Sequence, residues 1–187
     1  MLSPTHRIIE ALLFSAREPL TTEQACLALQ ETVDLGILVN ELNEHYDQSQ
    51  SPVWIQSVAE GYRLMTRPEF DPYVRRLFQS RGRVKLSASA LESLAIIAYK
   101  QPVTRIDIDA IRGVDSGATL RTLIEKNLVA ARGRQDGPGR PLLYCTTPHF
   151  LEYFGLNTIR DLPGIKEIEA LFSDSAEQSE PQQDASE

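Results

Sequence analysis

The sequence predicts a mostly α-helical fold with small β-hairpins (α+β), built as two tandem winged-helix domains with a disordered acidic tail. Two observations support this prediction: one pattern occurs twice, and each copy places three helix-like segments before two strand-like segments. The 187 residues accommodate two small domains and an extension. We expect the first domain at residues 1–84, the second at 85–163 and the extension at 164–187. Disorder is expected from about residue 173, because that segment has no large apolar side chain to bury.

The repeat is visible in the letters of the sequence. Residues 8–21 read IIEALLFSAREPLT and residues 91–104 read LESLAIIAYKQPVT, a shift of 83 positions with apolar residues at helical spacing in both. A second match, at a shift of 80, pairs Pro68 with Pro148 and Phe70 with Phe150. Two copies are too few for a solenoid, which needs about three stacked repeats. The pattern therefore indicates two copies of one small domain.

In the first copy, Ser3 and Pro4 are typical of a helix N-cap and first helical position. Thr21 with Gln24 predicts a capping box at the start of a second helix. Pro68 is expected to open the helix after the hairpin. The expected elements are helices at 4–16, 21–29 and 34–47, a hairpin of 53–58 and 62–66, and a helix at 68–79.

The second copy gives the same order. Ser89 with Glu92 predicts another capping box, Thr104 caps a second helix that ends near Gly113, and a third helix begins at residue 115 or 116. The remaining expected elements are strands at 128–132 and 142–146 and a helix opened by Pro148. Three helices followed by a β-hairpin are the order of a winged helix, a variant of the helix-turn-helix.

Charge is unevenly divided along the chain, although its total is −7. Residues 1–62 hold two basic and nine acidic side chains, residues 63–140 hold fifteen and eight, and residues 141–187 hold two and nine. The basic middle part is compatible with a solvated surface, or with a patch that contacts phosphate or an acidic partner. The candidates for non-specific phosphate contact are Arg75, Arg76, Arg81, Arg83, Arg132, Arg134 and Arg140.

The expected third helix of the first copy argues against sequence-specific DNA recognition. It contains Asp34, Glu41, Glu44 and Asp47 and no Lys or Arg. DNA phosphates would repel four carboxylates on one helix, so this helix is not expected to enter a major groove. We therefore expect DNA binding to be at most weak and non-specific.

No motif in the sequence predicts catalysis. There is no GxxxxGK[ST] loop for nucleotide phosphates, and His6, His45 and His149 have no partner at ligand spacing. We therefore expect no enzyme activity, no cofactor and no metal. The two cysteines form no CxxC motif, and no apolar run approaches the about 20 residues that span a bilayer. The expected location is the cytoplasm, without membrane contact.

Longer stretches carry a family resemblance. The segments LESLAIIAYKQPVTRIDIDAIRGVDSGATLRTLIEKNLV, GRPLLY, TTPHFLEYFGL and DLP closely resemble the bacterial segregation and condensation protein B family, ScpB. The match is dense from about residue 87 to 163 and weaker from 8 to 77, and Cys145 stands where relatives commonly have Gly. The resemblance implies a homodimer, with contact through the first repeat, that binds the kleisin ScpA and, through it, the SMC ATPase. It implies a role in chromosome condensation and segregation during cell division, in association with the nucleoid. The alternative is a tandem winged-helix DNA-binding transcription regulator.

Partner contact is expected at the end of the second repeat. Phe150, Tyr153, Phe154, Leu156 and Leu162 lie within thirteen residues, with few helical turns to hide them. Phe150 and Phe154 are compatible with a place in the core of the second domain or with partner contact. Leu156 and Leu162 are the better candidates for binding the kleisin.

Overall fold

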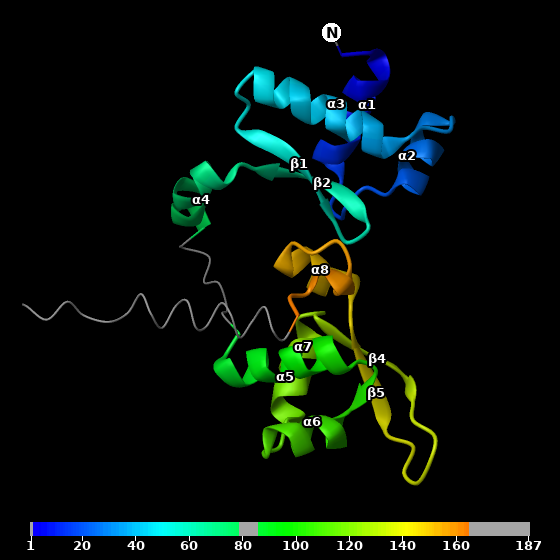
Figure 1. Cartoon of the computed structure of the whole chain (residues 1–187), viewed down its shortest axis with the longest axis vertical. Coiled ribbons are helices and arrows are strands. Elements are labelled where there is room, and N and C mark those ends of the chain that lie inside the picture. The colour runs from blue at the N-terminus through cyan, green and yellow to red at the C-terminus, as the bar shows by residue number, and fades with distance from the viewer. Residues whose placement is uncertain (1, 79–85, 165–187) are drawn as a thin grey trace, which may run out of the picture.

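The computed structural model describes residues 2–78 and 86–164, which fold around two separate clusters of buried side chains (Figure 1). The first cluster runs from Ile9 to Ile55 and the second from Ala90 to Phe150. Helices and small antiparallel sheets surround both, which confirms the predicted α+β class. The predicted boundary at residue 84 and the predicted disorder from about residue 173 lie outside the described residues.

The first cluster is enclosed by a winged helix. Its elements are α1 (Pro4–Ser15), α2 (Thr22–Leu29), α3 (Leu35–Gln48), and the hairpin of β1 (Val53–Val58) and β2 (Gly61–Thr66). The predicted caps Ser3 and Thr21 are confirmed, because each side chain accepts a hydrogen bond from the N–H three residues ahead. Leu20 pairs with Tyr62, and a Cβ at Gly61 would lie 3.0 Å from the Leu20 carbonyl oxygen. The hairpin therefore packs closely against the loop between α1 and α2.

The second cluster repeats the arrangement with one added short strand. Its elements are α5 (Ala88–Lys100), β3 (Val103–Thr104), α6 (Arg105–Arg112), α7 (Gly117–Glu125), β4 (Val129–Arg134), β5 (Leu142–Thr146) and α8 (Pro148–Phe154). The strand order is β3-β5-β4, with antiparallel pairing throughout. Thr104 caps α6 and Gly113 ends it in a left-handed conformation, as predicted. A 3₁₀ turn at Ile159–Asp161 follows α8.

One predicted cap is wrong. Ser87, not Ser89, caps α5, and its Oγ accepts a hydrogen bond from the Ala90 N–H at 3.2 Å. The caps Ser3 and Ser87 are 84 positions apart, so the first helices of the two copies align at a shift of 84 rather than 83. The second helices nevertheless start 83 positions apart, because α5 is one residue longer than α1 and the connection that follows it is two residues shorter.

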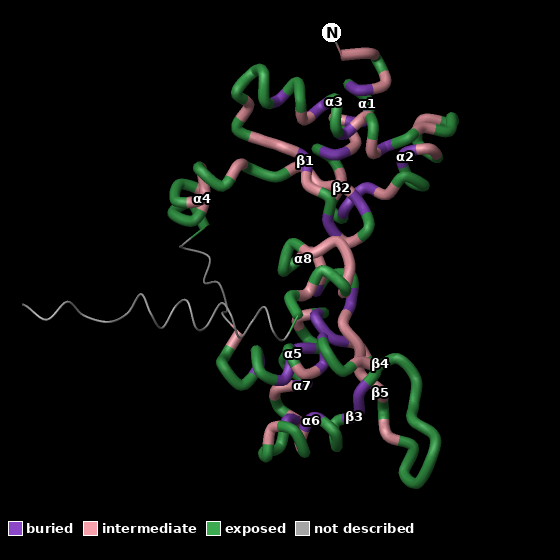
Figure 2. Tube along the Cα trace, viewed as in Figure 1, coloured by how far each residue is buried: buried purple, intermediate pink, exposed green. Residues whose placement is uncertain are grey.

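The helices that follow the two wings pack differently. α8 gives Phe150 to the second cluster, where its side chain is 3 % exposed. A 3₁₀ turn at Pro68–Phe70 leads into α4 (Asp71–Phe78), the equivalent helix of the first copy. α4 has no buried residue and gives none to the first cluster (Figure 2). It stands beside the β1–β2 hairpin, apart from α1 and α2 (Figure 1).

Candidate interaction surfaces

The tip of the first wing contacts the second domain. Its turn residues Ala59 and Glu60 have φ of 50° and 61°, values that non-glycine residues rarely adopt. The Ala59 N–H donates to the Leu156 carbonyl oxygen at 2.9 Å, and the Glu60 N–H donates to Asn157 Oδ1 at 2.9 Å. Ser57 Oγ lies 3.2 Å from the same Asn157 oxygen. The strained turn is therefore supported by bonds to the other domain.

An ion pair extends this contact. Arg63 Nη1 lies 2.7 Å from Glu152 Oε2, and the Glu152 side chain is 13 % exposed. Salt screens a partly buried pair of this kind less than a fully exposed one. Residues 57–63 and 152–157 together are called the wing-tip junction below. Beside it lies a cleft of about 620 Å³, whose lining includes Arg132 and Arg160.

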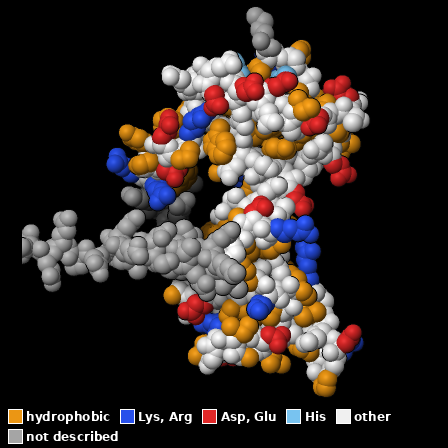
Figure 3. Space-filling view, viewed as in Figure 1, with side chains coloured by type: hydrophobic (Ala, Val, Ile, Leu, Met, Phe, Trp, Pro, Cys, Tyr) orange, Lys and Arg blue, Asp and Glu red, His pale blue; other side chains and the backbone are white. Residues whose placement is uncertain are grey.

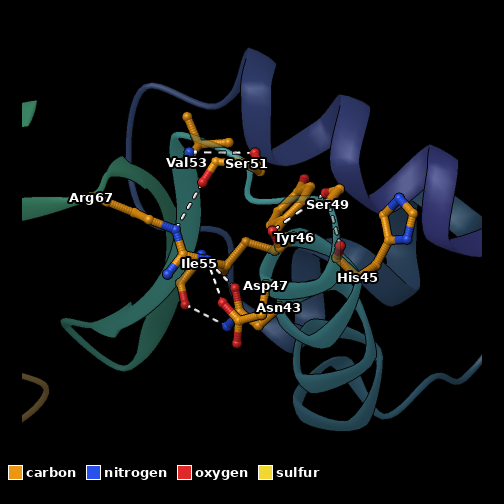
Figure 4. Close-up of polar contacts among 9 residues, drawn as sticks. All are labelled: Asn43, His45, Tyr46, Asp47, Ser49, Ser51, Val53, Ile55 and Arg67. Carbon is orange, nitrogen blue, oxygen red and sulfur yellow. Dashed lines mark hydrogen bonds and ion pairs between the residues drawn. The ribbon is translucent and has the colours of Figure 1, made fainter. Parts of the chain in front are cut away.

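The chain is anchored where it leaves the first wing for α4 (Figure 4). Arg67 Nε donates to the Ser51 carbonyl oxygen at 2.8 Å, and the guanidinium group pairs with the Asp47 carboxylate. Close by, the Asn43 side chain binds both the N–H and the carbonyl oxygen of Ile55, each at 2.8 Å. These contacts join the end of α3 to the hairpin and set the direction in which α4 departs.

In the first repeat, α1 and α4 each expose more than one large apolar side chain. On α4, Tyr73 and Leu77 are 67 % and 72 % exposed and lie one helical turn apart. Figure 3 shows hydrophobic side chains together with Lys or Arg side chains in this region. On α1, a groove of about 490 Å³ is lined by Pro4, Arg7, Ile8, Ala11, Leu12 and Ser15. Contiguous apolar surface of this kind indicates a contact site, whereas a single exposed residue does not.

The four side chains predicted to contact the kleisin lie in different environments. Phe150 is buried in the second cluster, so its ring cannot meet a partner in this conformation. Leu156 and Leu162 are half-buried and pack against the same cluster. Phe154 is 43 % exposed, with its ring centroid 4.9 Å from that of Phe150 and 5.1 Å from that of Tyr153. Within this segment, the rings of Tyr153 and Phe154 are the most accessible apolar surface.

Two of the arginines predicted to contact phosphate, Arg75 and Arg76, lie on α4 and each contact a side chain of the same helix. The Arg75 guanidinium lies 3.5 Å from the Asp71 carboxylate, one turn earlier on the helix. The guanidinium carbon of Arg76 lies 5.7 Å from the centroid of the Tyr73 ring. Both arginines remain exposed, and their positive charge therefore accompanies the apolar face of α4.

The other predicted phosphate contacts belong to the second wing or fall outside the described residues. Arg132 and Arg134 lie on β4 and Arg140 in the loop before β5, and all three are exposed. Arg134 Nη1 donates to the carbonyl oxygen of Arg140 at 3.0 Å, which draws the two sides of the wing together. Arg81 and Arg83 lie in the segment 79–85, outside the described residues.

Three of the four carboxylates predicted on the third helix serve the first domain itself. Asp34 caps α3 by accepting from the Ile37 N–H, and Glu41 Oε2 lies 2.6 Å from His6 Nε2. Asp47 pairs with Arg67. α3 contains no Lys or Arg, so we still predict that this helix does not enter the major groove of DNA.

In the second domain, two carboxylates organise α6. Asp107 accepts hydrogen bonds from the Thr104 hydroxyl at 2.6 Å and the Thr104 N–H at 3.1 Å, which lowers the Asp107 pKa below its ordinary value of 3.8. Asp109 accepts from the Ser116 hydroxyl and from its N–H at 2.7 Å, and these bonds lower the Asp109 pKa in the same way. Arg105 Nε lies 3.4 Å from Asp109 and adds to the effect. Both pKa shifts are caused by hydrogen bonds that cap α6 or hold the turn between α6 and α7.

Within residues 2–78 and 86–164, no group of three or more His, Cys, Asp or Glu side chains could hold a metal ion. None of the helices in that part of the chain is long and apolar enough to cross a membrane.

Sequence reasoning missed the wing-tip junction. The tight turn at residues 59–61 was predictable, but nothing in the periodicity links Glu60 to Asn157, 97 positions later. The one local signal is that a two-residue hairpin turn holds Ala and Glu, where Asn or Gly is usual.

Together, the fold and these surfaces define a class: tandem winged-helix proteins whose exposed features suit contact with other macromolecules. The chain belongs to the family described as segregation and condensation complex subunit ScpB, which residues 7–165 match. It is 50 % identical over 169 residues to the Segregation and condensation protein B of Syntrophotalea carbinolica, covering 90 % of this chain and 85 % of that relative. Family membership makes it a subunit of the segregation and condensation complex.

Two solved structures are also similar in sequence. ScpB from Mycobacterium tuberculosis is 33 % identical, covers 83 % of this chain and 99 % of its own, and gives a TM-score of 0.39. A dimer of an ScpB N-terminal domain complexed with an ScpA peptide is 25 % identical, covers 40 % of this chain and 94 % of its own, and gives a TM-score of 0.36.

Proposed function

We propose that this chain is a non-catalytic structural subunit that binds the kleisin ScpA, reaches the SMC ATPase through it, and supports chromosome condensation and segregation. The observation that carries the proposal is the 50 % identity over 169 residues to a segregation and condensation protein B. We propose further that it acts as a homodimer in the cytoplasm, at the nucleoid. The exposed apolar faces of α1 and α4 support a contact through the first repeat.

The proposed ScpA contact lies at the end of the second repeat. The accessible rings of Tyr153 and Phe154 would form its centre, with Leu156 and Leu162 at its edge. Calorimetry with purified ScpA tests this: Phe154→Ala should weaken binding at least about tenfold, as for a central interface residue. Phe14→Ala removes an exposed ring of the same kind on α1, away from this surface, and is the control. Unchanged affinity of Phe154→Ala would remove this surface from the proposal.

The alternative, a transcription regulator, makes a different prediction for the same protein. A pull-down from cell lysate should recover kleisin and SMC peptides if the chain is a complex subunit. Enrichment of DNA fragments of one sequence, without those peptides, would favour the regulator. The acidic α3 counts against the regulator, because a recognition helix needs favourable contacts with phosphate and base edges.

A further inference from the structure

The cleft beside the wing-tip junction is lined by two cationic side chains that have no partner. Its volume is about 620 Å³, and its lining includes Arg132 from β4 and Arg160 from the 3₁₀ turn after α8. Within residues 2–78 and 86–164, neither guanidinium group takes part in a hydrogen bond or an ion pair. Arg63 and Arg112, in contrast, are each paired with a glutamate. Figure 3 shows Lys or Arg side chains gathered where the two domains meet.

The carboxylates near this cleft neutralise only part of its positive charge. Glu152 is paired with Arg63, and Asp161 accepts hydrogen bonds within its own turn. Glu60 lines the cleft, and its carboxylate has no partner among the described residues. The backbone N–H of Glu60, not its carboxylate, makes the junction bond. The cleft therefore has two unpaired positive charges and one unpaired negative charge.

The neutral part of the lining leaves the arginines as the groups that attract a ligand. Three hydroxyl groups line the cleft, those of Thr146, Thr147 and Thr158. Each of them already donates a hydrogen bond inside the protein. Apolar side chains, among them Leu151 and Ile159, line the cleft as well. Walls of low polarity concentrate the field of the charges that they enclose, so the two guanidinium groups favour an anion in this cleft.

Positive charge continues from the cleft along the second wing. β4 is an edge strand of its sheet and carries both Arg132 and Arg134. Arg134 binds the carbonyl oxygen of Arg140 across the wing, and the loop between them holds one acidic side chain, Asp136. A small anion would occupy the cleft alone, whereas a polyanion could contact the cleft and the wing together. A nucleic-acid strand, with one phosphate per about 3.4 Å of helix axis, is such a polyanion.

We propose that this cleft binds a phosphate group of a nucleic-acid backbone between Arg132 and Arg160, while the second wing contacts neighbouring phosphates. Arg160 is absent from the phosphate contacts that the sequence predicts. The contact involves no base edge, so it gives weak binding without sequence preference and needs no recognition helix. The inference goes beyond the kleisin-binding role and does not rest on it.

Fluorescence anisotropy of the full chain with a labelled DNA duplex tests the proposal. Arg132→Ala and Arg160→Ala should each weaken binding about three- to tenfold and lower the slope of log affinity against log salt by about 1. Glu60→Gln should tighten binding, because it removes the unpaired carboxylate and keeps the junction bond. Arg7→Ala, which removes an exposed guanidinium group of the first domain, is the matched control and should change neither quantity.

The two cysteines allow a direct test of where the ligand lies. Cys145 lines the cleft, Cys26 lies on α2, and both are half-buried. A duplex should slow the alkylation of Cys145 by iodoacetamide in proportion to the bound fraction of protein and leave Cys26 unchanged, as measured by mass spectrometry. Inorganic phosphate at the same ionic strength should protect Cys145 less than the duplex does. Equal protection would assign the cleft to free phosphate and overturn the nucleic-acid proposal.

The variants give outcomes of opposite sign, which separates a specific cleft from general attraction to positive charge. Unchanged affinity of Arg160→Ala, no gain with Glu60→Gln, or a wild type that binds no duplex would each overturn the proposal. So would a loss with Arg121→Ala, on α7, equal to that with Arg160→Ala, because it would indicate binding through the helix. Circular dichroism checks folding, and Arg160→Gln replaces Arg160→Ala if that variant does not fold.

Discussion

At the scale of single residues, polar side chains that bind backbone groups connect elements distant in the sequence. Asn43 joins α3 to β1 through both backbone groups of Ile55. In the second domain, Gln101 Oε1 accepts from the Thr146 N–H at 2.7 Å and so joins the end of α5 to β5. Removing one partner of such a pair leaves the other without its hydrogen bond, which costs more than the net contribution of the pair.

Asn43→Ala is therefore expected to lower the free energy of unfolding by about 1–3 kcal/mol, because two backbone groups of Ile55 lose their partner. Urea denaturation followed by circular dichroism measures this. Asn40→Ala, on the exposed side of the same helix, should change stability by less than about 0.5 kcal/mol. Equal effects of the two substitutions would contradict the assigned role of Asn43.

Asp109 gives a prediction about pH. Its pKa is lowered in the folded protein, so the ionised form stabilises the fold above the ordinary pKa of 3.8, and this contribution is lost as the pH falls through the lower, folded-state pKa. Asp109→Asn should lower the urea midpoint at pH 7 and make the loss of stability below about pH 4 shallower than in wild type. Asp136→Asn, in the exposed second wing, is the control. An unchanged acid slope in Asp109→Asn would refute the assignment.

At the scale of elements, helix starts marked by side-chain caps were predictable and packing between elements was not. Thr21 and Thr104 were assigned from residues within one helical turn, and the structure confirms both. Ser89 failed because Ser87, two residues earlier, can cap the same helix, and local sequence does not discriminate between them. Pro68 and Phe70 precede α4, whereas Pro148 and Phe150 lie within α8. Only Phe150 reaches a core, and Arg67 anchors the chain that leads to α4.

The wing-tip junction should depend on Asn157. Asn157→Ala removes the acceptor for the Glu60 N–H and for Ser57, so the two domains should separate more often. Pulsed dipolar spectroscopy, with one spin label on α3 and one on α7, should show a broader distance distribution than in wild type. Asn40→Ala again serves as the control, and an identical distribution in Asn157→Ala would show that the junction does not hold the domains.

At the scale of the whole molecule, the fold and the net charge give opposite expectations about DNA binding. Winged helices are common in DNA-binding proteins, but this chain has a net charge of −7, and its basic side chains lie mainly between residues 63 and 140. DNA binding should therefore be non-specific, with a dissociation constant on the order of 10⁻⁴–10⁻⁶ M at physiological salt. Fluorescence anisotropy with duplexes of unrelated sequence measures this, and nanomolar, sequence-selective binding would contradict it.

The same titrations can locate the phosphate contacts. Replacing Arg132, Arg134 and Arg140 by Ala should reduce the slope of log affinity against log salt by about 3 if each arginine contacts one phosphate. Replacing Arg75 and Arg76 in a separate variant tests α4 as the contact instead. An unchanged slope in both variants would remove these arginines from the DNA-binding surface.

The wing-tip junction also bears on the order of folding. Each hydrophobic cluster comes from its own continuous stretch of chain, whereas the bond from Glu60 to Asn157 closes a loop of 97 positions. Closing a longer loop costs more conformational entropy, so the junction should form after both domains have folded. Domains emerge from the ribosome in sequence order, and the first wing would therefore wait with its strained turn unsupported until residue 157 has been synthesised. Translation speed through the second domain would then set how long that turn stays without its partner.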